Sequence, residues 1–151
     1  MRTILVVVAV LALCPSTQVL GQESGSLRLS DLTAQGATQL AKDELQALLP
    51  GAKVESKTAQ GSTRFWENSA DGSLVASSDG RGGNSSFTAG AKSTARGTWQ
   101  LSDNGTYCVL LEWKRTTEQW CRYIFKSGDK YFAVKSTVDQ STVAHELAFS
   151  H

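Results

Sequence analysis

The amino-acid sequence predicts a mainly β (α+β) domain, in which an N-terminal amphipathic helix packs on a seven- or eight-stranded antiparallel meander. Apolar residues recur at helical spacing only between residues 40 and 49, and short alternating segments separated by glycine turns fill most of the rest. Two cysteines lie on neighbouring predicted strands. A meander of this length is expected to curl or close into a small barrel, because closure protects its edge strands.

Residues 1–21 have the pattern of a signal peptide. Arg2 precedes an apolar run of eleven residues, and Gly21 offers a cleavage site. The run is shorter than the ~20 residues that span a bilayer, which disfavours a permanent anchor. Lipidation at Cys14 is disfavoured because Leu13 is not small. We therefore expect an exported protein, periplasmic or secreted, without stable membrane insertion after cleavage.

The remaining chain divides into a flexible leader over 22–39, a helix-plus-meander domain over 40–138 and a C-terminal tail over 139–151. Because Arg2 is the only charged residue in 1–21, this part carries 14 basic and 14 acidic residues. A formally neutral chain offers no basic field to nucleic acid or to an anionic membrane, so we expect neither as a partner.

Each predicted element has its own signal. Leucines and alanines from Leu40 to Leu49 form the apolar stripe of the helix, and Pro50-Gly51 ends the helix. We expect this apolar face to cover the sheet as a lid. The segment 77–95 is rich in Ser, Gly, Thr and Ala, and predicts either a weak strand around 86–91 or a long mobile loop. The tail includes a possible helical turn over 142–148. The other predicted strands cover residues 54–58, 64–67, 73–77, 97–101, 106–113, 116–125 and 131–136.

The two cysteines of the mature chain predict a structural disulfide. If Trp113 pairs with Thr116, the register places Cys108 directly opposite Cys121, as a bridge requires. The alternatives are a metal pair or a reactive thiol, but no CxxC spacing exists and both histidines lie near the C-terminus. The bridge should contribute roughly 3 kcal/mol, and no metal or cofactor is expected.

The same register suggests a candidate ligand site. It places Tyr107 opposite Arg122, so the guanidinium is expected over the tyrosine ring, and Arg122 is the best candidate for a polar group inside a pocket. The four tryptophans either line this pocket or, as the favoured alternative, fill the core at roughly 200 Å² each. The candidate ligand-binding residues are Arg122, Tyr107, Trp66, Trp99, Trp113 and Trp120.

No arrangement of catalytic residues is recognisable. A Ser/His/Asp triad would need a histidine, and both are close to the C-terminus. The carboxylates of Glu112 and Glu118 flank a turn and are expected to be solvated. The glycine-rich segment 79–83 lacks the Gly-Lys-Ser/Thr ending of a phosphate loop.

Several short motifs occur here in a characteristic order and spacing. They are Asp43-Glu-Leu45-x-x-Leu48-Leu-Pro50-Gly51, Gly97-Thr-Trp99, Gly105, Cys108, Cys121-Arg-Tyr123 and Gly128-Asp129-x-Tyr131. In these residues the chain resembles the small exported proteobacterial proteins of the domain of unknown function 995 family. The resemblance covers roughly residues 40–132, apart from the Ser/Gly-rich stretch 77–95, and it implies a bacterial, periplasmic setting and no established activity.

The sequence thus favours a soluble, exported, non-catalytic binding or structural module of the bacterial envelope. Its partner would be a small apolar ligand or a protein. The alternatives are a small periplasmic hydrolase and an envelope stress-related protein without a small ligand. The shape of the barrel interior discriminates among them: a filled core argues against ligand binding, whereas a cleft that joins Arg122 to a carboxylate favours an enzyme.

Overall fold

The structure is a computed structural model that describes residues 26–80 and 93–151. The signal peptide and the weak strand or loop predicted around 86–91 lie outside the described residues. The helices are α1 (Leu29–Ala34) and α2 (Lys42–Leu48), and the strands are β1 (Thr38–Gln39), β2 (Lys53–Lys57), β3 (Thr63–Asn68), β4 (Ser73–Ser78), β5 (Ser93–Leu101), β6 (Tyr107–Trp113), β7 (Thr117–Ser127), β8 (Lys130–Val134) and β9 (His145–Ser150).

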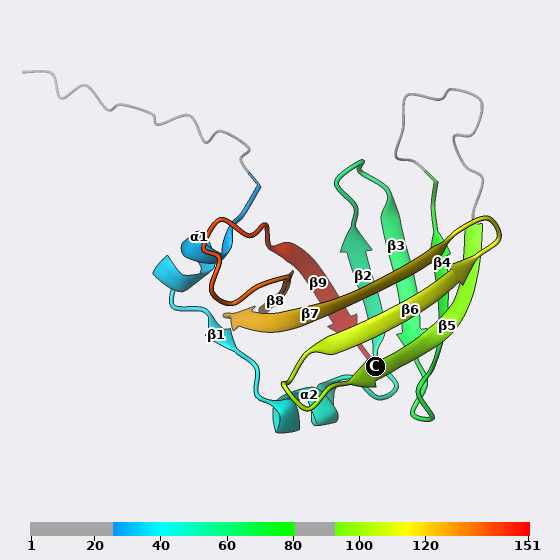
Figure 1. Cartoon of the computed structure of the whole chain (residues 1–151), viewed down its shortest axis with the longest axis horizontal. Helices are drawn as coiled ribbons and strands as arrows, with labels where there is room; N and C mark the ends of the chain where they lie inside the picture. The colour runs from blue at the N-terminus through cyan, green and yellow to red at the C-terminus, as the bar shows by residue number, and fades with distance from the viewer. Residues whose placement is uncertain (1–25, 81–92) are drawn as a thin grey trace, which may run out of the picture.

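Eight antiparallel strands form a closed barrel (Figure 1). The order around the barrel is β7-β6-β5-β4-β3-β2-β9-β8, and pairing of β7 with β8 closes it. The long strand β7 makes closure possible, because its first half pairs with β6 and its second half pairs with β8. The short strand β1 adds a ninth strand beside the end of β7. The predicted mainly β fold, closed as a small barrel, is confirmed.

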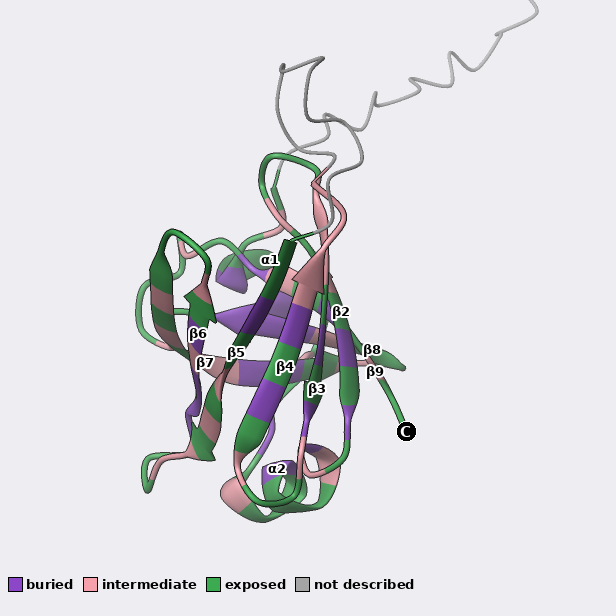
Figure 2. Ribbon diagram, turned by 90° about the vertical axis from the view of Figure 1, so that its right-hand side faces the viewer, coloured by how far each residue is buried: buried purple, intermediate pink, exposed green. Residues whose placement is uncertain are grey.

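Side chains alternate between the inside and the outside of the barrel, as the burial of β4 shows in Figure 2. On β6, Tyr107, Val109 and Leu111 are buried in the main core. Cys108 has the opposite parity and is bonded to Cys121 on β7, so the disulfide lies on the outer face. The predicted disulfide and its register are confirmed.

Helix α2 closes one end of the barrel, as the sequence predicts (Figure 1). Leu45 and Leu49, from the helix and the residue after it, are completely buried in the barrel core. At the start of the helix, the Glu44 carboxylate accepts a hydrogen bond from the backbone N–H of Ala41 at 2.7 Å. Beyond its end, Gly51 adopts a φ of 75°, which glycine tolerates better than other residues.

The prediction of a flexible leader over 22–39 is wrong for residues 29–39, which form α1 and β1. Leu29 and Leu32 are completely buried against Phe125 and Phe132 on the outer face of β7 and β8. The segment is too polar for a clear amphipathic pattern, and its two leucines become ordered only because the barrel presents an apolar outer surface to them.

The C-terminal tail predicted over 139–151, with its helical turn over 142–148, is also wrong in part. Residues 145–150 form β9, which pairs with β2 on one side and with β8 on the other. His145, Leu147 and Phe149 share the inner face, and this period of two is the strand signal that the sequence reading missed. The barrel therefore closes only through the residues that were expected to be a tail.

Candidate functional site

The barrel is hollow at the end opposite α2. There it contains a cavity of about 310 Å³, near the lower limit of the roughly 300–1,000 Å³ typical of ligand pockets. Inward-facing residues from six barrel strands line it, and the β2–β3 turn lies over it. The inward-facing residues that line it include Ser56, Arg64, Trp66, Leu111, Glu118, Trp120, Arg122, Ala133, His145 and Leu147.

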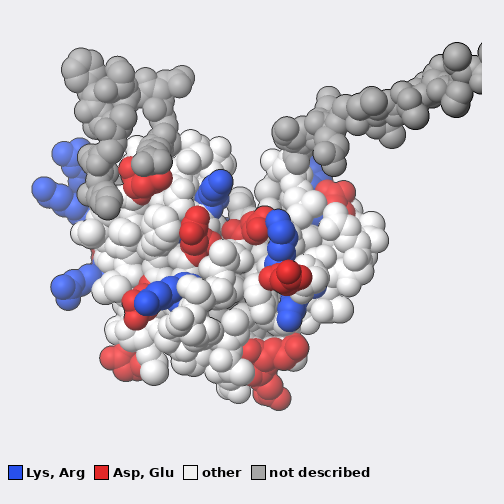
Figure 3. Space-filling view, turned by 180° about the vertical axis from the view of Figure 1, so that it is seen from behind, with Lys and Arg blue, Asp and Glu red and all other residues white. Residues whose placement is uncertain are grey.

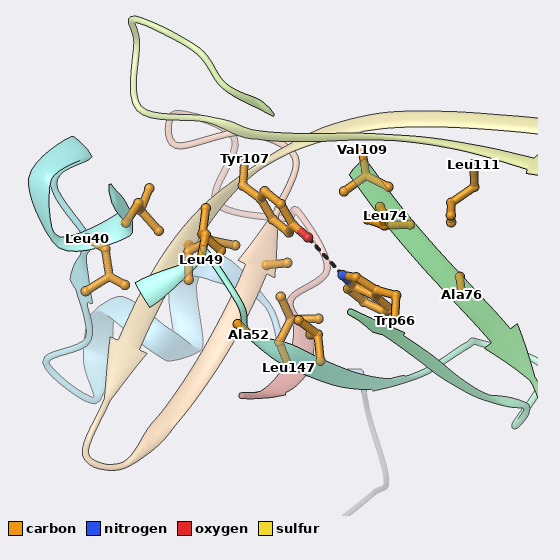
Figure 4. Packing of buried hydrophobic residues seen from close by; sticks show 14 of the residues in the cluster. Leu40, Leu49, Ala52, Trp66, Leu74, Ala76, Tyr107, Val109, Leu111 and Leu147 are labelled. Atoms are coloured by element: carbon orange, nitrogen blue, oxygen red, sulfur yellow. Dashed lines mark hydrogen bonds between the residues drawn. The ribbon is translucent and has the colours of Figure 1, made fainter. Parts of the chain in front are cut away.

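A buried hydrogen-bond network begins at Trp66, which lines this cavity, and its first bond joins Trp66 to Tyr107 (Figure 4). The indole Nε1 of Trp66 donates to the Tyr107 hydroxyl at 2.8 Å, and that hydroxyl donates to Asn68 Oδ1 at 2.8 Å. The Asn68 amide then donates to the carbonyl of Leu49 at 3.1 Å, just beyond α2. Burial raises the pKa of Tyr107, so the hydroxyl stays protonated. The network joins the cavity wall to the helix that closes the barrel.

An ion pair spans the rim of the cavity between β3 and β7. Arg64 Nη1 lies 2.6 Å from both carboxylate oxygens of Glu118, and both side chains are about one-third exposed. The indole of Trp113 donates to the same carboxylate at 3.3 Å, and the Arg64 guanidinium lies 5.3 Å from the centre of the Trp113 ring. The Nε atom of Arg64 is buried without a hydrogen-bond partner among the described residues.

Arg122 and His145 add a second polar group to the wall. The Arg122 guanidinium donates to its neighbouring carbonyl at Cys121 and lies 5.8 Å from the centre of the Trp120 ring. In the described part of the chain no carboxylate forms an ion pair with it. Burial, and then the charge of Arg122, lower the pKa of His145, so its imidazole is neutral near pH 7.

The predicted site residues lie in four different places. Arg122, Trp66 and Trp120 line the cavity, and Trp113 stands at its rim beside the ion pair. Tyr107 is buried in the core behind Trp66, whereas the Trp99 indole donates to the carbonyl of Ser69 near the end closed by α2. Trp66 is thus both a buried core side chain and part of the cavity wall. Filling the core and lining a pocket, the two roles considered for the tryptophans, are therefore compatible.

Two expectations at this site need correction. The predicted guanidinium–ring contact exists, but it joins Arg122 to Trp120 on its own strand rather than to Tyr107. Glu118 is not a solvated turn residue, because it has the inward parity of Trp120 and Arg122 and is paired with Arg64. The alternation Glu118-x-Trp120-x-Arg122 was the signal for this position.

Arg64, Glu118 and His145 are the site residues that the sequence reading missed. Arg64 lies two residues before Trp66 on β3, so the same parity argument places it inside. His145 could not be found in this way, because its segment was not recognised as a strand.

A larger hollow, of about 660 Å³, lies on the outer face of β9, β2, β3 and β4. The exposed side chains of Phe65 and Val75 contribute to it, but no network of polar groups converges there. The face seen in Figure 3 carries acidic and basic side chains interspersed. We therefore take the inner cavity as the candidate site, since it combines apolar walls with a few oriented polar groups.

Within residues 26–80 and 93–151, no group of three or more His, Cys, Asp or Glu side chains is placed to hold a metal ion. Over the same residues, no helix is long and apolar enough to cross a membrane.

Comparison with curated proteins finds no match, and comparison with solved structures finds none either. Comparison with protein families matches residues 26–122 to the family described as Protein of unknown function (DUF995). The match begins upstream of α1, includes α2 and strands β2 to β6, and ends at Arg122 in β7. It covers more than half of the chain, and the resemblance noted in the sequence is thereby confirmed: the protein is a member of the DUF995 family.

Proposed function

We propose that this protein is an exported, non-catalytic binding module that holds a small, largely apolar ligand inside its barrel. The observation that carries the proposal is the cavity of about 310 Å³, which Trp66 and Trp120 both line. The cavity opens to solvent at the end of the barrel opposite α2, so a small ligand could enter it directly.

The walls of the cavity suit a ligand with an apolar body. Leu111, Ala133 and Leu147 contribute aliphatic surface, and the two tryptophan rings meet edge to face with their centres 6.1 Å apart. Rigid aromatic walls lose little conformational entropy when a ligand binds. The Trp66 ring is already fixed by its hydrogen bond to Tyr107, so this part of the site is preorganised.

Export is the second part of the proposal, and the disulfide supports it. A disulfide persists in oxidising compartments and is rare in the cytosol of most organisms. Together with the signal-peptide pattern of residues 1–21, the Cys108–Cys121 bridge favours a periplasmic or secreted protein. Accumulation of the processed chain in a periplasmic fraction would test this directly, and retention of the full-length chain in the cytoplasm would contradict it.

A small hydrolase is the second candidate, because the cavity brings Arg122, Glu118 and the neutral His145 to one wall. However, both carboxylate oxygens of Glu118 are occupied by Arg64, and the Trp113 indole donates to one of them. A carboxylate held in this way is poorly placed to take a proton from a water molecule. The arrangement therefore favours binding over hydrolysis, and screening ester and amide substrates against a His145→Gln control would test the alternative.

Binding can be tested with N-phenyl-1-naphthylamine, a neutral apolar fluorophore. We expect it to quench tryptophan emission and to gain fluorescence when titrated into the mature protein. Ala133→Leu should abolish the signal, because Ala133 lines the cavity and is 4% exposed. Leu111→Phe fills the same space and serves as a second variant if the first does not fold.

The matched control is Ala148→Leu, on the outer face of β9. It adds the same bulk to the larger outer hollow and should leave probe binding unchanged. No probe binding to the wild-type protein, or binding that Ala148→Leu abolishes and Ala133→Leu preserves, would refute the proposed inner site.

A further inference from the structure

We infer that the ligand of the inner cavity is a small monocarboxylate with an apolar body, whose carboxylate is held by Arg122. This inference rests on the proposed function and specifies its ligand class. It starts from Arg122, a cavity-lining guanidinium that has no ion pair with any described residue and donates only to the carbonyl of Cys121.

The charge balance of the cavity leaves one inner cation to be neutralised. Arg64 and Glu118 neutralise one another at 2.6 Å. Lys57 also lines the cavity, but it is an exposed residue at the end of β2 and its charge is solvated. Arg122 is therefore the cation that an anionic ligand would meet inside, and one guanidinium matches a monoanion better than a phosphate dianion.

His145 supports this arrangement without adding charge. Its imidazole is neutral near Arg122, so it can donate one hydrogen bond to a carboxylate or turn its other nitrogen toward the guanidinium. Leu147 and Ala133 lie beside it on the same wall and would contact the apolar body.

A carboxylate also fits the environment of the guanidinium. The barrel wall partly desolvates Arg122, and its guanidinium lies over the Trp120 ring. An arginine stacked on an aromatic ring in this way can still bind a carboxylate through the N–H groups at its edge. A charged group in such a place is stabilised by an opposite charge more strongly than in water, because the local dielectric constant is lower.

The experiment compares octanoate with octanamide, which have the same chain and nearly the same shape but differ in charge. Binding to the mature, disulfide-bonded protein is measured by calorimetry and by tryptophan quenching. We expect octanoate to bind about 10- to 100-fold more tightly than octanamide, the range for one hydrogen bond to a charged group.

Arg122→Met should remove this preference, so that octanoate binds no more tightly than octanamide, since the methionine keeps an apolar stem of similar length but has no charge. Arg96→Met is the matched control: it removes an arginine from the outer face of β5 and should keep the preference intact. Thermal unfolding of each variant checks that it is folded, and the comparison of the two ligands in the wild-type protein needs no variant.

The results distinguish a failure of the carboxylate ligand class from a failure of the proposed binding function. Equal affinity for octanoate and octanamide would overturn the carboxylate inference and leave the binding proposal standing. A preference that survives Arg122→Met would also overturn it, because the anion would then be held elsewhere. Binding of neither compound, when N-phenyl-1-naphthylamine still binds, refutes this ligand class; if that probe fails as well, the proposed function itself fails.

Discussion

Removing one hydroxyl group from the buried network behind Trp66 should destabilise the whole barrel. In Tyr107→Phe the ring stays, but Trp66 Nε1 loses its acceptor and Asn68 Oδ1 loses its donor, each formerly at 2.8 Å. Tyr107 and Asn68 are completely buried and Trp66 is 6% exposed, so water cannot replace the lost partner without opening the core.

The expected loss of stability follows from the two polar groups, Trp66 Nε1 and Asn68 Oδ1, that Tyr107→Phe leaves without a partner. A buried polar group left without a partner costs about 1–3 kcal/mol, and part of this is recovered because a hydroxyl no longer has to be desolvated. We expect the free energy of unfolding to fall by about 2–5 kcal/mol, a large share of the roughly 5–15 kcal/mol available to a domain of this size.

Urea unfolding measures this change, followed in parallel by tryptophan fluorescence and far-UV circular dichroism with the disulfide intact. The midpoint should fall with little change in the m-value, since the native barrel is retained. Tyr131→Phe is the matched control: the Tyr131 ring packs against Phe149, but its hydroxyl makes no hydrogen bond to a described residue, so a change within about 0.5 kcal/mol is expected. A loss below about 1 kcal/mol in Tyr107→Phe, or one equal to the control, would refute the account of the network.

Two further predictions concern the strand contacts and the cavity wall. Gly97→Ala should destabilise the protein by more than about 2 kcal/mol in the same urea assay, because the added Cβ would lie 1.7 Å from the carbonyl oxygen of Leu110 on β6. A variant as stable as the wild type would contradict this, since it would mean that β5 and β6 move apart at little cost. His145 should titrate below its usual pKa of 6.5 in an NMR titration, and Arg122→Met should raise that pKa without fully restoring it, since burial is the larger cause. The folded state then binds fewer protons than the unfolded state below pH 6.5, so stability should decline as the pH falls from 6.5 towards the folded pKa; a pKa at or above 6.5 would contradict this.

The parts of the fold that local sequence determines were predictable. Strands β5, β6 and β7 show clear alternation of apolar and polar residues and are separated by turns. Pairing Trp113 with Thr116 places the two cysteines opposite each other, and the same register pairs Val109 with Trp120 and Tyr107 with Arg122. Helix α2 was predictable because its apolar stripe and its Pro-Gly stop lie next to each other, within residues 40–51.

The parts that depend on distant segments were not predictable. Helix α1 has too few apolar residues to be recognised alone, and β9 has partners far away in the chain. At the site, Arg122 was identified because apolar residues flank it, whereas Arg64 and Glu118 resemble ordinary surface residues. A charged residue at the end of a barrel strand can face either the lumen or the solvent, and only the parity of its neighbours distinguishes the two.

The pairing of β2 with β9 has a consequence for how the chain acquires its cavity. The first strand of the barrel is hydrogen-bonded to the last one, so the ring cannot close before residues 145–150 are present. Until then the growing chain has two open sheet edges, on β2 and on β8, which are sites of aggregation. Pairing over such a sequence distance also slows folding, since the entropy of a long loop must be lost before the contacts form. The barrel should therefore form only after residues 145–150 have been synthesised.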